Sequence, residues 1–191
     1  MAPNIKVTKE MILEAGYKLV TISGIESVNS RSIAKILECS TQPIFSQFPN
    51  MKELRQKLHD YICEKFEREV LCSEDFDSII QSSYLKVTSL AKNNRNVFRL
   101  IYMSEYCMGG SFLTTRMRFR SNQKIFEEIK TQYKIGDEEC ADVLERISLL
   151  VQGIATLIAT SNVQYEDEQI VKIVNQTLVD MINGIKERGV K

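Results

Sequence analysis

Residues 29–52 read NSRSIAKILECSTQPIFSQFPNMK, and this stretch decides how the N-terminal part of the chain folds. Two short segments with the apolar spacing of a helix flank a break at residues 38–40. The apolar positions that create this spacing are Ile33, Ala34 and Leu37 in the first segment, and Ile44 and Phe48 in the second. Two short helices joined by a tight turn are typical of a helix-turn-helix, which this stretch therefore predicts.

Single residues around the break favour the same assignment. Ala34 is small at a position where two helices must cross closely, and Cys39 offers a small apolar side chain to fill the turn. Ser40 is predicted to be the N-cap of the second helix. Pro43 then falls in the first turn of that helix, where a missing N–H costs nothing because this N–H would have no acceptor within the helix.

The run STQPIFSQFPNMKEL, residues 40–54, resembles the recognition-helix signature of the TetR family of bacterial transcriptional regulators, roughly Ser-x-Gly-Thr-Leu-Tyr-x-His-Phe-x-Ser-Lys-Glu-x-Leu. The match extends over residues 8–66, and the remainder resembles the family only in length and helical character. The resemblance implies an all-α fold of about nine helices. A three-helix helix-turn-helix DNA-binding domain would occupy residues 1–50, and a helical ligand-binding and dimerisation domain residues 51–191.

The chain departs from the family pattern at three functional positions. Glu38 stands where glycine is usual in the turn, so we expect a non-glycine residue in a left-handed conformation. Phe45 replaces a tyrosine whose hydroxyl commonly binds phosphate, and Met51 takes the place of a common phosphate-binding lysine. Either the affinity for DNA is modest, or neighbours such as Lys52 and the helix N-termini replace these contacts.

Capping residues and apolar spacing predict the remaining helices. The first helix is expected over residues 8–23 with Gly24 as a left-handed stop. Asn29 or Ser30 is expected to cap the second helix, and the family resemblance favours Asn29. Asn50 and Glu53 have capping-box spacing and open a fourth helix. The later helical segments are expected over residues 75–92, 96–108, 111–133, 138–161 (capped by Asp137) and 167–187, with no strand.

Composition limits the class of protein. At 191 residues and 43% hydrophobic content, the chain can bury a sizeable core without disulfides. Its five cysteines are odd in number and scattered, with no CxxC pair or metal-ligand spacing, which favours a reducing compartment. The first residues lack the apolar core of a signal peptide, and no stretch reaches the roughly 20 uninterrupted apolar residues of a membrane span. We therefore expect a soluble cytoplasmic protein without membrane contact, metal or cofactor.

Charge is unevenly distributed along a chain whose formal net charge is zero. Residues 1–57 carry eight Lys and Arg against five Glu, a net charge of +3, and residues 58–191 carry 17 basic against 20 acidic residues, a net charge of −3. A mildly basic N-terminal part on a mildly acidic remainder fits a protein that touches DNA at one end only.

In a helix-turn-helix, residues at the start of the recognition helix face the major groove, whereas capping residues and helix N-termini take phosphates. The residues predicted to contact a double-stranded DNA operator are Arg31, Ser40, Thr41, Gln42, Pro43, Phe45, Gln47 and Lys52. Gln42 could bond adenine through two hydrogen bonds, and Thr41 or Pro43 could meet a thymine methyl group. The alternative is that both glutamines are merely solvated polar side chains.

Aromatic and sulfur side chains gather around the Gly109-Gly110 break, as in many small-molecule pockets. The residues predicted to line a pocket for an unknown effector are Tyr102, Met103, Tyr106, Cys107, Phe112, Met117 and Phe119. The alternative is that they form packed core. Arginines alternate over residues 116–120 and would spread around a helix axis, either to bind an anion or to form a solvated face.

The last two predicted helices carry surplus apolar surface, which two copies of the chain could bury as a four-helix bundle. The residues predicted at this homodimer interface are Ile147, Leu150, Ile154, Leu157, Ile173, Leu178 and Met181. A symmetric pair would place two recognition helices about 34–36 Å apart, in successive major grooves of a palindrome.

The sequence gives little support for an enzyme. His59 is the single histidine and precedes Cys63 by four residues, a pairing expected to be a surface histidine beside a core cysteine rather than a nucleophile and its base. No Gly-rich phosphate loop, HExxH or GxSxG is present. The resemblance implies a repressor that a small molecule releases from its operator. The alternatives are a regulator triggered by thiol chemistry at Cys107 or another cysteine, or an all-helical interaction module that does not bind DNA.

Overall fold

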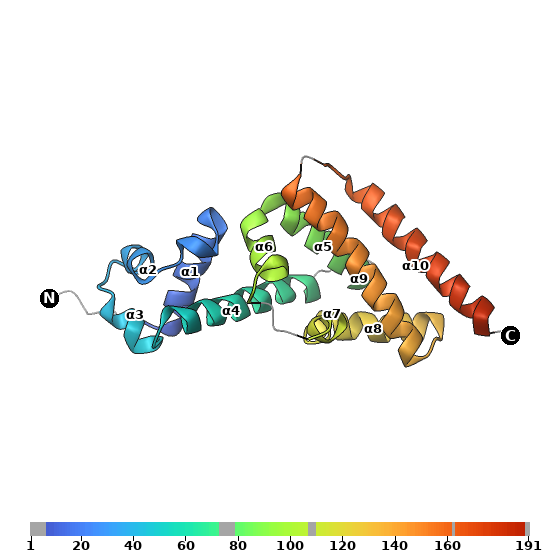
Figure 1. The fold of residues 1–191 in the computed structure, drawn as a ribbon, viewed down its shortest axis with the longest axis horizontal. Coiled ribbons are helices and arrows are strands. Elements are labelled where there is room, and N and C mark those ends of the chain that lie inside the picture. The colour runs from blue at the N-terminus through green and yellow to red at the C-terminus, as the bar shows by residue number, and fades with distance from the viewer. Residues whose placement is uncertain (1–6, 73–78, 107–109, 162, 190–191) are drawn as a thin grey trace. The chain divides into compact units, whose positions relative to one another are not determined.

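The structure is a computed structural model of the chain that describes residues 7–72, 79–106, 110–161 and 163–189. These residues are all-α, with ten α-helices, one 3-10 helix and no strand among them (Figure 1). The elements are α1 (Lys9–Ser23), η1 (Ile25–Ser27), α2 (Ser30–Ile36), α3 (Gln42–Gln47), α4 (Met51–Leu71), α5 (Ile79–Asn93), α6 (Arg95–Met103), α7 (Phe112–Arg116), α8 (Arg120–Tyr133), α9 (Asp137–Thr160) and α10 (Asp167–Gly189). The predicted all-α fold with an N-terminal helix-turn-helix is confirmed.

The chain divides into two compact units. The head unit comprises Met1–Lys65 and Asn94–Tyr106, and the body unit comprises Phe66–Asn93 and Cys107–Lys191. The head unit therefore extends beyond the predicted domain boundary at residue 50, because it includes most of α4 and all of α6. A functional boundary at residue 50 stays a prediction.

Helix α1 begins and ends as its capping residues predict. The Thr8 side chain accepts a hydrogen bond from the Met11 N–H, and Gly24 follows the last residue with a positive φ of 79°. The amide of Gly24 bonds the Val20 carbonyl, and the Asn96 side chain of α6 donates to the Thr21 carbonyl. The bond from Asn96 joins α6 to the end of α1 within the head unit.

Helix α4 is held against the rest of the head unit by buried leucines and polar bonds. Leu54 and Leu58 are fully buried, and Leu58 lies against Gly16 of α1. A Cβ added at Gly16 would lie 2.9 Å from the Leu58 side chain. The Arg55 guanidinium donates two hydrogen bonds to the Val28 carbonyl at 2.9 and 3.2 Å. The Tyr61 hydroxyl donates to the Glu14 carboxylate at 2.5 Å, which, together with Lys65, lowers the pKa of Glu14.

The body unit is built around α9, which packs against α5, α8 and α10. Helix α5 is tied to α10 by Tyr84, whose hydroxyl donates to Asn175, and burial raises the pKa of Tyr84 to about 12. Lys92 forms an ion pair of 2.6 Å with Asp167 at the start of α10. The apolar faces of these helices pack together in one core.

Two predictions about the body helices are wrong. The segment 111–133 is two helices rather than one, because the chain leaves helical geometry after Met117 and the Gln123 and Asn122 side chains bond the carbonyls of Met117 and Arg116. Asp137 lies inside α9 rather than before it. Gly136 is the N-cap, and the Glu139 carboxylate accepts a hydrogen bond from its N–H.

Candidate nucleic-acid interface

The second and third helices are joined by a tight turn that contains a non-glycine residue with positive φ. Asn29 caps α2 by accepting hydrogen bonds from the amides of Arg31 and Ser32, which completes the predicted cap. After α2, Glu38 has a φ of 50°, and the amide of Cys39 bonds the Ala34 carbonyl at 3.0 Å. The left-handed conformation expected at Glu38 is confirmed, so the turn forms without the usual glycine.

Helix α3 begins one residue later than predicted. The N-cap is Thr41 rather than Ser40, and the Thr41 carbonyl accepts hydrogen bonds from the amides of Ile44 and Phe45. No side chain caps α3. Because Pro43 sits at the second helical position, one of the two amides that a capping side chain could bind is missing. Pro43 lies in the first turn as expected.

The short helix α3 presents two contrasting faces. Ile44 is fully buried and Phe48 is 2% exposed, so these residues fix α3 in the head core. On the opposite face Gln42 and Ser46 are exposed, and the Phe45 ring keeps 47% of its surface exposed. A buried anchor beneath an exposed mixed face is the arrangement that a groove-reading helix needs.

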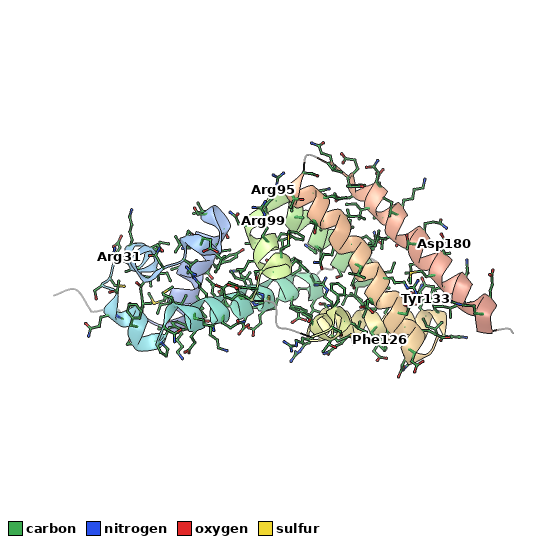
Figure 2. All side chains as sticks on the ribbon, viewed as in Figure 1. Arg31, Arg95, Arg99, Phe126, Tyr133 and Asp180 are labelled. Atoms are coloured by element: carbon green, nitrogen blue, oxygen red, sulfur yellow. The ribbon has the colours of Figure 1, made fainter. Side chains whose placement is uncertain are left out.

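Cations lie on the elements that flank α3, together with the exposed Glu38 and Glu53, but not on α3 itself. Residues 39–50 contain no Asp, Glu, Lys or Arg. Exposed cations lie on the neighbouring elements: Arg31 and Lys35 on α2 (Arg31 is labelled in Figure 2) and Lys52 at the start of α4. The Lys9 ammonium lies 5.8 Å from the centre of the Phe48 ring. Side chains suited to phosphates therefore flank side chains suited to base edges.

The eight residues predicted to bind DNA all belong to the head unit. Those that are exposed are Arg31, Ser40, Gln42, Phe45 and Lys52, and those that are half-buried are Thr41, Pro43 and Gln47. Lys35 was missed by the sequence analysis, although its place four residues after Arg31 puts both on one side of α2.

The residues predicted to line an effector pocket fall into different units. Tyr102, Met103 and Tyr106 belong to the head unit, Phe112, Met117 and Phe119 to the body unit, and Cys107 lies outside the described residues. A hollow of about 430 Å³ in the head unit lies between the end of α1 and α6. Its lining includes Met103 and Tyr106 together with Glu26, Asn96 and Arg99. The complete pocket stays a prediction.

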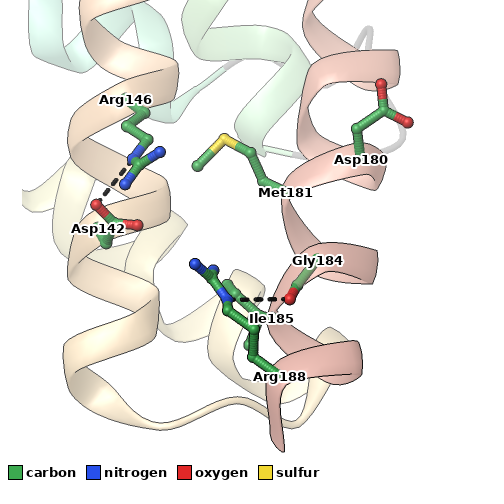
Figure 3. Close-up of a pocket in the computed structure, with 7 residues that line it drawn as sticks. All are labelled: Asp142, Arg146, Asp180, Met181, Gly184, Ile185 and Arg188. Carbon is green, nitrogen blue, oxygen red and sulfur yellow. Dashed lines mark hydrogen bonds and ion pairs between the residues drawn. The ribbon is translucent and has the colours of Figure 1, made fainter.

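A second hollow, of about 280 Å³, lies between α9 and α10 (Figure 3). Its lining residues are Asp142 and Arg146 from α9, and Asp180, Met181, Gly184, Ile185 and Arg188 from α10. The Arg146 Nε lies 2.8 Å from the Asp142 carboxylate, and the Arg188 Nε donates to the Gly184 carbonyl. Charged side chains of both signs thus line this hollow.

The predicted interface residues differ in their availability to a second copy. Ile147, Ile154 and Leu178 are buried by their own chain, whereas Leu157 and Ile173 are 45% and 36% exposed. Leu150 and Met181 are half-buried. Leu149 of α9 and Val179 of α10, 51% and 44% exposed, were not among the predicted residues. For Leu149, apolar residues on nearly all sides of α9 make its outward face hard to recognise from the sequence.

The cysteine and histidine pair is more buried than predicted. His59 is 8% exposed rather than at the surface, and the Cys63 Sγ lies 3.5 Å from its Nε2. Burial lowers the pKa of His59. In the body unit, burial raises the pKa of Cys140 to about 11, so this thiol stays protonated and poorly reactive.

Comparison with known proteins identifies the fold. No protein-family model matches the sequence, and no curated protein is similar to it. Among solved structures, a TetR variant from Acinetobacter baumannii AYE, in complex with minocycline, superposes with a TM-score of 0.62. The alignment covers 95% of this chain and 98% of that chain at 16% identity. The chain has a TetR-like fold.

One described helix of this TetR-like fold, α9, is long and apolar enough to cross a membrane by length and composition alone. Core helices of soluble proteins pass the same test, and α9 packs against α5, α7, α8 and α10 of the body unit. The apolar composition of α9 is therefore explained by its central position in that unit.

Proposed function

We propose that this protein is a homodimeric DNA-binding transcriptional regulator of the cytoplasm, not an enzyme, and that a small molecule releases it from a palindromic operator. The observation that carries the proposal is the exposed, uncharged face of α3 between cationic residues of α2 and α4. Residues 1–50 would supply the DNA-binding domain, and residues 51–191 the ligand-binding and dimerisation domain.

The proposed DNA contacts follow from the chemistry of each exposed side chain. Gln42 and Phe45 lie three positions apart on the open face of α3, where they can meet base edges in the major groove. Arg31, Lys35 and Lys52 lie on flanking helices, where they can neutralise phosphates. Lys52 and Lys35 would compensate for the hydroxyl and ammonium groups that Phe45 and Met51 lack relative to the family pattern.

The proposed dimer surface is the outward face of α9 and α10. Leu149, Leu157 and Ile173 are exposed there. A Cβ added at Gly153 or Gly184 would meet nothing within 4 Å, so packing within the chain does not require either glycine. Glycine inside a helix costs about 1 kcal/mol relative to alanine. Close approach of a second copy would account for both glycines.

Charge also fits self-association of this face. The hollow between α9 and α10 carries two aspartates and two arginines. In a two-fold symmetric interface the same patch faces itself, so acidic residues of one copy can meet arginines of the other. Palindromic DNA would then meet two identical heads.

The proposed effector is a small molecule with aromatic or apolar surface. The solved protein with a similar fold is in complex with minocycline. In this chain, Tyr102 stacks on the buried Phe98 ring at 5.1 Å, and Phe112 lies beneath the Arg116 guanidinium. A molecule that binds one conformation of the dimer better than another would change operator affinity by that difference in binding energy.

The proposal is tested by fluorescence anisotropy of the full chain with labelled duplex from the region flanking its own gene, at increasing salt concentration. We expect specific binding whose affinity falls steeply with salt, because phosphate contacts release counterions. An interaction module without DNA binding predicts no difference between this duplex and a scrambled one. For the thiol alternative, an unchanged response to peroxide after Cys107→Ser substitution would remove Cys107 as the trigger.

A further inference from the structure

The recognition segment lacks the side chains that usually read guanine and cytosine. Guanine is most often read by Arg or Lys and cytosine by Asp or Glu, and none of these residue types occurs in residues 39–50. Exposed cations on α2 and at the start of α4 flank this segment in the sequence, and the Lys9 ammonium of α1 lies 5.8 Å from the centre of the Phe48 ring. Charged readout of G·C pairs is therefore unavailable from α3 itself.

The open face of α3 instead combines an amide with apolar surface. Gln42 is exposed and can make paired hydrogen bonds to adenine. Three residues later, the Phe45 ring is 47% exposed, and Pro43 is half-buried beside them. A ring left in water gains free energy by meeting apolar surface, and the thymine methyl is the apolar group that the major groove presents.

We infer that each operator half-site is centred on A·T base pairs, with Gln42 reading adenine and Phe45 and Pro43 packing on thymine methyl groups. This inference rests on the proposed function and names the chemistry of its DNA target. Phe45 then has a role in specificity. It lacks the hydroxyl that commonly binds phosphate at this position, and its apolar ring distinguishes thymine from cytosine.

The test begins with selection of bound duplexes from a random double-stranded pool by the full-length protein. We expect the selected half-sites to share a central A·T segment. Deoxyuridine is then substituted for thymidine at each position of that segment, which removes only the 5-methyl group. Each methyl group that contacts α3 should contribute about fourfold to the affinity, as expected for one buried carbon.

A pair of variants assigns the methyl contact to its side chain. Phe45→Ala should weaken binding to the thymidine duplex but leave binding to the matching deoxyuridine duplex nearly unchanged, because the variant and the base change remove the same contact. Ile22→Ala is the matched control: Ile22 is an apolar residue of α1, 77% exposed, in the same unit. The Ile22→Ala variant should lose affinity for the deoxyuridine duplex by the same factor as the unaltered protein does.

The outcomes separate the inference from the function on which it rests. Selected half-sites centred on G·C pairs, or A·T half-sites that bind equally well with deoxyuridine, would overturn the inference and leave a DNA-binding regulator. Failure to select any sequence, together with binding that does not depend on salt, would overturn both. Thermal unfolding of Phe45→Ala confirms that it is folded before its affinity is compared.

Discussion

Two of the surfaces on which the described residues expose apolar side chains differ in what surrounds them. On α3 in the head unit, Phe45 stands beside Gln42 and Ser46, with no charge on the helix. On α9 and α10 in the body unit, exposed leucine and isoleucine accompany glycines and charges of both signs. The first surface suits flat, uncharged base edges, and the second suits a copy of itself. Exposed apolar area alone would not have distinguished these uses.

The largest expected effect comes from removing the anchor beneath the α3 surface. Ile44→Ala should lower the free energy of unfolding by about 2–5 kcal/mol, because it leaves a cavity at a fully buried site. Chemical denaturation measures this change. Ile36→Ala, at a residue of α2 that is 38% exposed, is the control and should cost far less. Equal costs would show that α3 is not anchored as described.

A change on the open face should affect DNA binding without affecting folding. Gln42→Ala should weaken operator binding by about 1–3 kcal/mol through loss of a bidentate base contact. Gln132→Ala, at an exposed position of α8 in the body unit, should leave affinity unchanged. Anisotropy titrations of both variants measure the difference. A loss of less than about 0.3 kcal/mol for Gln42→Ala would mean that this side chain is only solvated.

The cap of α2 should matter for stability to an intermediate degree. Asn29→Ala removes the acceptor for the amides of Arg31 and Ser32 and should cost about 1 kcal/mol. Asn29→Gly should cost only a few tenths, because glycine is tolerated at N-caps. The denaturant concentrations at the midpoint of unfolding, with an unchanged dependence of the free energy on denaturant, check the two values. If both variants cost the same, the side-chain bonds contribute nothing.

On the body surface, one substitution should have opposite effects on folding and on association. Gly153→Ala should stabilise the folded chain by up to about 1 kcal/mol, since its Cβ would meet open space. The same methyl group should weaken the dimer if a second copy approaches there. Sedimentation equilibrium over a range of concentrations gives the association constant. A variant that is both more stable and equally dimeric would place the interface elsewhere.

The smallest expected effect is confined to mildly acidic pH. Burial lowers the pKa of His59 below its ordinary value of 6.5, so the unfolded chain binds a proton more readily than the folded chain. The resulting stability is present above pH 6.5 and is lost as pH falls from there towards the folded pKa. The free energy of unfolding should therefore change more between about pH 7.5 and about pH 5.5 for the unaltered chain than for His59→Gln. The same change in the free energy of unfolding for both chains would contradict a contribution from His59.

Local sequence predicted the head surface well because its signals are local. Asn29, Gly24 and Pro43 restrict the backbone within a few residues, and each lies where its chemistry places it. The error at Ser40 arises because no side chain caps α3, so a capping residue does not fix where this helix begins.

The body surface was harder to predict because it depends on contacts between distant segments. Which side of α9 faces outward is decided by its packing on α5, α8 and α10, and its sequence is apolar on nearly all sides. Ile147 and Ile154 therefore proved buried, whereas Leu149 is exposed. The buried position of His59 was missed for a similar reason, since Tyr106, whose ring centre lies 6.3 Å from that of His59, follows α6 and is far from His59 in the sequence.

Hydroxyl-radical footprinting of the full-length protein on its selected operator tests the central claim most directly. The account predicts two protected segments on one side of the duplex, about one helical turn (34–36 Å) apart, one for each copy of α3. With Gln42→Ala, protection of both segments should require higher protein concentrations, by the same factor as the loss of affinity. A single protected segment, or protection that Gln42→Ala leaves unchanged, would contradict a paired α3 in the major groove.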